Sequence, residues 1–159
     1  MIDGVGRTID YVRISVTDRC NLRCVYCMPE EGVPSIPHGQ ILRFEEILRV
    51  CRVLAKNGTR KVKLTGGEPL VRKGILDLTA ELKAIPGIEN ITITTNGVLL
   101  EELYDGLVDA GIDAITVSLD TLDPQVYQSI TRRDEAARVR RGLERAMREG
   151  RVPLKINCV

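Results

Sequence analysis

Residues 60–95, RKVKLTGGEPLVRKGILDLTAELKAIPGIENITITT, contain the pattern that best indicates the fold. Two short segments rich in β-branched residues, 60–65 and 90–95, enclose a segment at 75–84 whose apolar residues recur with a helical period. A helix between two strands is a βαβ unit, which places both strands parallel in one sheet. The stretch therefore predicts a parallel α/β fold.

The same alternation of strand and helix continues on both sides of this stretch. Further strands are expected at Tyr11–Val16, Ala114–Leu119 and Pro153–Cys158, and further helices at Phe44–Lys56, Leu99–Ala110 and Glu135–Glu149. A glycine follows each expected helix, which suits the left-handed residue that often closes one. These glycines are Gly58, Gly87, Gly111 and Gly150.

Polar residues occupy every second position of the expected strands. They are Arg13 and Ser15, Lys63 and Thr65, Thr92 and Thr94, Thr116 and Ser118, and Lys155 and Asn157. Because side chains alternate between the two faces of a strand, one whole face of the sheet is expected to be polar. A sheet covered by helices on both faces would instead be continuously apolar. The pattern favours a (βα) barrel-type layout around a wet pocket over an open doubly wound sheet.

The length of the chain limits how much of a barrel it can form. A complete eight-unit barrel needs about 250 residues, whereas the chain has 159, and no helix follows the last expected strand. We therefore expect a partial TIM-type barrel of about five parallel strands with outer helices, truncated within a larger protein. No linker or low-complexity segment interrupts residues 1–159, so a single domain is expected.

Composition excludes several classes of function. The net charge of +1 gives no general attraction to nucleic acid or anionic membrane, and the arginines of residues 131–151 alternate with acidic residues as on a solvated helix face. No membrane span or signal-peptide core is present, so a cytoplasmic location is expected. Cysteines of a cytoplasmic protein are poor disulfide candidates. Cys51, on a helical apolar stripe, and Cys158, near a strand end, are expected to be buried.

The other three cysteines lie close together in the loop after the first strand. Cys20, Cys24 and Cys27 have the spacing C-x3-C-x2-C. Three such thiolates can converge on one soft metal centre and leave one position for a ligand that is not protein. Zinc with His38 as an outside ligand is an alternative, although the second C-x2-C pair typical of structural zinc sites is absent. The spacing favours an iron–sulfur cluster.

The ends of the other strands also carry groups that suit a binding site. Residues 65–69 read TGGEP, residues 96–97 are Asn-Gly, and residues 118–120 are Ser-Leu-Asp. Two glycines let backbone approach a ligand closely, and Glu68 can accept hydrogen bonds from an ammonium group. Each stretch alone could be an ordinary turn. Together they predict a site at the carboxyl ends of the strands, where barrel enzymes place their chemistry.

The cysteine loop and the GGEP stretch resemble the cluster-binding and SAM-binding motifs of radical S-adenosylmethionine (SAM) enzymes. Residues 10–19, 94–97 and 155–157 narrow the resemblance to the GTP 3′,8-cyclase (molybdenum cofactor biosynthesis protein A) family, and the resemblance covers essentially all 159 residues. It implies that residues 1–159 are the N-terminal portion of a radical SAM core domain. The implied activity is that of a lyase that converts GTP to 3′,8-cyclo-7,8-dihydro-GTP.

The resemblance also implies roles for individual residues. Cys20, Cys24 and Cys27 would ligate one [4Fe–4S] cluster. The SAM contacts would be Tyr26, Gly67, Glu68 and Ser118, and the GTP contacts would be Arg13, Lys63, Thr94 and Lys155. Physical reasoning agrees on the three cations of the last set, because they fall on the polar face and a triphosphate needs converging positive charge. The family commonly has arginine in place of Lys63, so the bidentate fork is lost here.

The implied reaction needs partners and parts beyond this chain. An electron donor reduces the cluster, SAM is split to a 5′-deoxyadenosyl radical, and that radical takes hydrogen from C3′ of GTP before the ribose attacks C8. The family's second [4Fe–4S] cluster is expected only in a missing C-terminal half, so the chain alone is not expected to complete turnover. A homodimer is compatible with the sequence, which does not determine the oligomeric state. The alternatives are another radical SAM enzyme with a different substrate, or a zinc-binding module without enzymatic activity.

Overall fold

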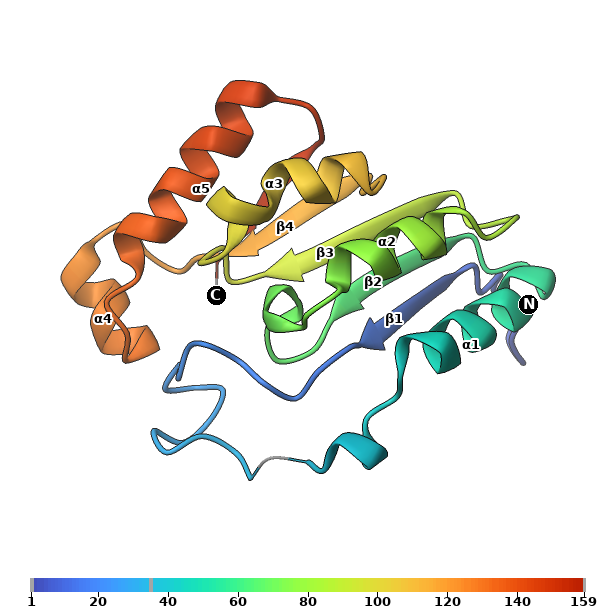
Figure 1. The fold of residues 1–159 in the computed structure, drawn as a ribbon, viewed down its shortest axis with the longest axis horizontal. Helices are drawn as coiled ribbons and strands as arrows, with labels where there is room; N and C mark the ends of the chain where they lie inside the picture. Colours follow the sequence, from blue (N-terminus) through green and yellow to red (C-terminus); the bar gives the residue numbers. More distant parts are fainter. Residues whose placement is uncertain (1, 35, 159) are drawn as a thin grey trace.

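The computed structural model of the chain describes residues 2–34 and 36–158. Its five strands are β1 (Tyr11–Ser15), β2 (Lys61–Thr65), β3 (Asn90–Thr95), β4 (Ala114–Ser118) and β5 (Leu154–Asn157). All pair in parallel and lie in the sheet in the order of the sequence, as Figure 1 shows. A doubly wound sheet reverses its strand order at a switch point, and this sheet has none. The predicted partial barrel is therefore confirmed.

Helices follow the strands in turn. They are α1 (Phe44–Lys56), α2 (Ile75–Lys83), α3 (Leu100–Asp109), α4 (Pro124–Thr131) and α5 (Ala136–Glu149), with short 3-10 turns η1 (His38–Gln40) and η2 (Pro69–Val71). In Figure 1, α1, α2 and α3 lie along the sheet, each beside the strands that it connects. Gly150 closes α5 with a φ of 59°, in the left-handed region expected from the sequence.

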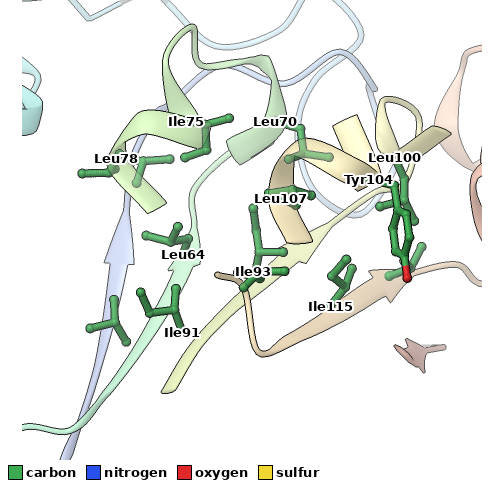
Figure 2. Packing of buried hydrophobic residues seen from close by; sticks show 14 of the residues in the cluster. Leu64, Leu70, Ile75, Leu78, Ile91, Ile93, Leu100, Tyr104, Leu107 and Ile115 are labelled. Atoms are coloured by element: carbon green, nitrogen blue, oxygen red, sulfur yellow. The ribbon is translucent and has the colours of Figure 1, made fainter. Parts of the chain in front are cut away.

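The core lies between the sheet and this helical layer. Alternate residues of the central strands, such as Leu64, Ile93 and Ile115, are fully buried. Figure 2 shows them facing the apolar residues of α2 and α3, among them Leu78 and Leu107. The residues between them in each central strand are only half-buried. One face of the sheet is thus polar and uncovered, as the alternation predicted.

Two expectations about single elements need correction. Helix α4 was missed, although Asp123-Pro124 is a recognisable start: the Asp123 carboxylate accepts from Gln125 N at 2.8 Å and Val126 N at 3.1 Å, and Pro124 suits the first turn. Cys158 was expected to be buried but is exposed, because β5 is an edge strand that pairs only with β4. The expectation for Cys51 is confirmed, since it is fully buried.

Four arginines, three on α5 and one just after it, form ion pairs with α3. Arg138 contacts Glu102 at 2.7 Å, and Arg145 contacts Asp105 at 2.6 Å. Similar pairs join Arg141 to Glu101 and Arg151 to Asp109, both at 2.8 Å. These arginines therefore have carboxylate partners within the chain. Among the helices of the described residues, none is long and apolar enough to cross a membrane.

Cys51 and Cys158 are expected to differ strongly in reaction with iodoacetamide. Burial excludes the reagent from Cys51 and raises the pKa of its thiol to about 11, so that only about one thiol in a thousand is ionised at pH 8. Cys158 is exposed and should be labelled well before Cys51. Mass spectrometry of timed digests measures both rates. Labelling of Cys51 at the rate of Cys158 in the folded chain would contradict the buried position.

Candidate functional site

The cysteine loop is attached on one side to the end of β2. Beyond β1, Val16 N donates to Thr65 O at 2.8 Å, and the pairing continues past the strand ends. There Gly67 N donates to Thr17 O and Glu68 N donates to Arg19 O, both at 2.7 Å. The GGEP stretch therefore fixes the backbone that leads directly into Cys20.

Gly67 is required by this close approach of two backbone segments. A Cβ atom on Gly67 would lie 2.2 Å from Arg19 O and 2.8 Å from Asp18 O, far inside contact distance. Its neighbour Gly66 has a φ of 146°, which side chains rarely allow. Sequence reasoning assigned the glycines to approach of a ligand. In the structure they admit the cysteine loop itself.

The other side of the cysteine loop is attached to the end of α4. Arg23 N donates to Thr131 O at 3.0 Å, and Val25 N donates to Ile130 O at 2.9 Å. The guanidinium of Arg132 then donates to Arg23 O at 3.0 Å and to Met28 O at 3.2 Å. The helix that the sequence analysis missed is thus one of the two supports of the loop.

The three cysteines of the loop lie near one another. Cys20 and Cys24 are half-buried and Cys27 is exposed. Burial raises the pKa of Cys20 and of Cys24. The charges of Glu68 and Cys27 raise the pKa of Cys20 further, and those of Cys20 and Cys27 raise that of Cys24. Within the described residues, however, no three Cys, His, Asp or Glu side chains are already gathered as a metal site. The loop holds the thiols within electrostatic range and would draw them together around a cluster.

The donors around Cys20 fit an iron–sulfur ligand. Its sulfur accepts from Leu22 N at 3.4 Å and from the Asn96 side-chain amide at 3.7 Å. Such N–H groups stabilise a thiolate and tune cluster potentials. The three thiols and these donors together fit a [4Fe–4S] cluster. The side chain of His38, which the zinc alternative would use, lies outside the described part of the chain.

Glu68 is buried and already bound by neighbouring residues. It is 1% exposed, and its carboxylate accepts from Leu70 N at 3.0 Å, Thr95 Oγ1 at 2.7 Å and Asn96 N at 2.6 Å. Burial raises the pKa of this carboxyl, and the three donors oppose that change by stabilising the carboxylate. Glu68 therefore joins the ends of β2 and β3, a role that its motif did not indicate.

Replacement of Glu68 by glutamine is expected to lower the free energy of unfolding by about 2 kcal/mol. One amide oxygen cannot accept all three donors, and a buried donor left unsatisfied costs about 1–3 kcal/mol. Urea unfolding monitored by circular dichroism measures the difference. Glu45→Gln, on the exposed surface of α1, is the matched control and should stay within about 0.5 kcal/mol of the parent. Equal stability of the two variants would contradict the role of Glu68.

Tyr26 and Ser118 meet beside Cys24. The Tyr26 hydroxyl donates to Asp120 Oδ2 at 2.6 Å, which ties the cysteine loop to the end of β4. Tyr26, Ser118 and Cys24 line one small pocket of about 50 Å³, which Tyr127 also borders. A larger open pocket of about 370 Å³ lies beside Cys20 and Arg23. The predicted SAM contacts from the loop and from β4 are therefore adjacent.

The four predicted GTP contacts form two rows across the polar face. Arg13 and Lys63 are direct neighbours in the β1–β2 register. Two residues further along the strands, Thr94 and Lys155 both align with Thr116. In residues 2–34 and 36–158, no carboxylate lies within ion-pair distance of Arg13, Lys63 or Lys155. Adjacent cations without counterions on an uncovered face are suited to an anionic ligand.

Sequential parallel strands, a supported three-cysteine loop and a cationic inner face together define a radical SAM core. Residues 14–159 match the family model described as the radical SAM superfamily, and the chain belongs to that superfamily. Solved structures agree on the fold. The chain superposes on anSMEcpe with bound AdoMet (TM-score 0.72, 20% identity, 93% of this chain and 43% of that chain). It also superposes on Streptococcus suis SuiB bound to S-adenosylmethionine (TM-score 0.71, 22% identity, 94% and 32%).

Curated relatives place the chain more narrowly by similarity. It is 51% identical to a GTP 3′,8-cyclase of Petrotoga mobilis and 54% identical to one of Pelotomaculum thermopropionicum, over all 159 residues and 49% of each relative. It is 48% identical to molybdenum cofactor biosynthesis protein 1 of Bos taurus, over 25% of that protein. The chain thus spans about half the length of the two bacterial relatives and about a quarter of the bovine one.

Proposed function

We propose that the chain is the N-terminal portion of a radical SAM GTP 3′,8-cyclase, a lyase of molybdenum cofactor biosynthesis, with residues 1–159 as the first part of its core domain. The observation that carries the proposal is the combination of a three-thiol loop beyond the strand ends with Arg13, Lys63 and Lys155 on the polar face, cations that have no carboxylate at ion-pair distance among the described residues. Alignment of all 159 residues with GTP 3′,8-cyclases at 51–54% identity supports the same assignment.

In this proposal the cysteine loop holds the cluster and its surroundings hold SAM. Cys20, Cys24 and Cys27 ligate a [4Fe–4S] cluster, which when bound supplies one electron for the reductive cleavage of SAM. Tyr26 and Ser118 contact SAM in the pocket beside Cys24. We assign Gly67 and Glu68 to SAM as well, as the resemblance of the GGEP residues to the SAM-binding motif implies.

The geometry limits what those last two residues can offer to SAM. The Gly67 N–H already donates to Thr17 O, so it is not available to a ligand. An ionised carboxylate has about four acceptor positions, and Glu68 uses three of them internally. Glu68 therefore has one position left for the ammonium group of SAM.

The inner face of the sheet binds GTP in the same proposal. Arg13, Lys63 and Lys155 neutralise the triphosphate, and the Thr94 hydroxyl donates to it or to the ribose. Lys63 acts as a point charge, since an ammonium lacks the fork of a guanidinium. The partners are GTP and an external one-electron donor in the cytoplasm, without nucleic acid or membrane. Any second cluster would have its ligands outside residues 1–159.

An anaerobic reconstitution tests the cluster and SAM sites. The chain is loaded with iron and sulfide, reduced, and examined by EPR with and without SAM. We expect a [4Fe–4S]⁺ signal that changes when SAM is added, because the three cysteines leave one iron open. A chain that binds zinc and no cluster, or a cluster whose signal is insensitive to SAM, would overturn the proposal.

Binding of GTP is expected to weaken about tenfold when either Arg13 or Lys63 is replaced by glutamine. A hydrogen bond to a charged group contributes about 1.5–3 kcal/mol, and 1.4 kcal/mol corresponds to a tenfold change in affinity. Isothermal titration calorimetry measures the dissociation constants. Arg52→Gln removes the same charge from the exposed side of α1 and should leave affinity unchanged. An equal loss of GTP affinity in Arg52→Gln would mean that GTP is held only by the overall positive charge. Unchanged GTP affinity in both Arg13→Gln and Lys63→Gln would indicate another substrate.

A further inference from the structure

We propose that Asn96, directly after β3, is the positioning residue that holds Cys20 and so sets the place and the electronic environment of the first cluster ligand. The proposal rests on the proposed function in one respect, that Cys20 ligates the cluster. No motif assigned a role to Asn96 beyond that of a turn residue. Its contacts join three parts of the chain that are far apart in sequence.

The backbone N–H and both polar side-chain atoms of Asn96 have partners. The backbone N donates to Glu68 Oε2 at 2.6 Å, and Oδ1 accepts from Val98 N at 3.0 Å. On its other side, Nδ2 donates to Asn21 Oδ1 at 2.7 Å and to Cys20 Sγ at 3.7 Å. The last two bonds span 75 and 76 residues of sequence. Asn96 therefore links β3 directly to the cysteine loop.

The direction in which the Asn96 amide points is determined by the backbone around it. Val98 N–H can only donate, so the amide oxygen must face Val98 and the amide nitrogen must face the loop. Glu68 restrains the backbone of Asn96 because its buried carboxylate accepts from Asn96 N and from the preceding side chain, Thr95. The donor aimed at Cys20 is thus held by a network that needs no ligand to form.

The effect of this donor on a cluster follows from electrostatics. An N–H group beside a ligating sulfur stabilises negative charge there, and cluster potentials depend on such hydrogen bonds. Cys20 receives two of them, one from Leu22 N within the loop and one from Asn96 across the site. Of these two donors, the Asn96 amide also donates to Asn21 and so restrains the residue after Cys20. Its loss should loosen the loop and make the reduced cluster less stable.

Asn96→Asp is the sharpest test, because it keeps the oxygen that accepts from Val98 N and replaces only the donor. A carboxylate oxygen would then face Asn21 Oδ1 and Cys20 Sγ. In the reconstituted chain we expect the ratio of reduced to oxidised cluster at a fixed potential to fall about tenfold, which is a shift of about 59 mV for one electron. Asn57→Asp, at the end of α1, makes the same chemical change away from the site and should cause no shift.

A second measurement is made on the chain without cluster. Amide hydrogen exchange at Leu22 and Arg23 should become at least several-fold faster in Asn96→Asp and in Asn21→Ala, which removes the acceptor from the opposite side, while Asn57→Asp matches the parent. If the parent forms no cluster, the function proposal fails and exchange still tests Asn96. Unchanged exchange together with an unchanged potential would overturn the role of Asn96. If Asn96→Asp does not fold, Asn21→Ala alone decides, and parental exchange in that variant overturns the proposal.

Discussion

The Cys24→Ser chain is expected to lose its cluster on anaerobic reconstitution, with affinity reduced by more than about 100-fold. Replacing a residue that only orients a metal ligand typically lowers metal affinity 10–100-fold. Cys24 is proposed as a ligand itself, so its loss should lower the affinity further. A serine hydroxyl stays protonated near neutral pH and is a poor ligand for iron in a cluster. Iron and acid-labile sulfide per chain, with the visible absorbance of the cluster, measure the effect.

Cys158→Ser is the matched control for this prediction. Cys158 is exposed and lies outside the cysteine loop, where its thiol donates to Asp120 O at 3.4 Å. This variant should bind as much iron and sulfide as the parent. Full cluster content in Cys24→Ser, or equal losses in both variants, would remove Cys24 from the ligand set.

Gly67→Ala is expected to lower the free energy of unfolding by at least about 3 kcal/mol, toward the upper end for overpacking. The added methyl group would meet the backbone of Arg19 and Asp18, which cannot rotate away as a flexible side chain could. For a chain of this size the loss corresponds to a fall of roughly 6–12 °C in Tm. The displaced segment leads into Cys20, so cluster content should fall with stability. Differential scanning calorimetry and iron analysis measure the two effects.

Gly4→Ala makes the same change where nothing lies within 4 Å of the new carbon and no positive φ is required. It should unfold within about 1 °C of the parent, as substitutions at open surface positions usually do. A Gly67→Ala chain as stable as Gly4→Ala would mean that the backbone of the cysteine loop can move away from the GGEP stretch. The loop would then not be positioned by that contact.

Much of the fold could be predicted because its signals are local. Helix α1 was expected at Phe44–Lys56 and is found there, and β3 likewise at Asn90–Thr95. The apolar period of a helix and the alternation of a strand are set by the geometry of a few consecutive residues. Alternation over five strands was also sufficient to predict a polar face and hence a barrel-type sheet. Helix α4 was missed because eight residues carry little periodicity, although its Asp-Pro start was visible.

For the site, the residue types and their order along the chain could be predicted: three thiols in one loop, glycines after β2, and cations on alternate positions of strands. Which atoms meet depends on the folded chain. Folding placed Arg19 against Gly67, engaged the Glu68 carboxylate with Thr95 and Asn96, and left Cys158 exposed just after the edge strand β5. The physical reason is that a hydrogen bond or a close backbone approach depends on distances between segments far apart in the chain, which no local period contains.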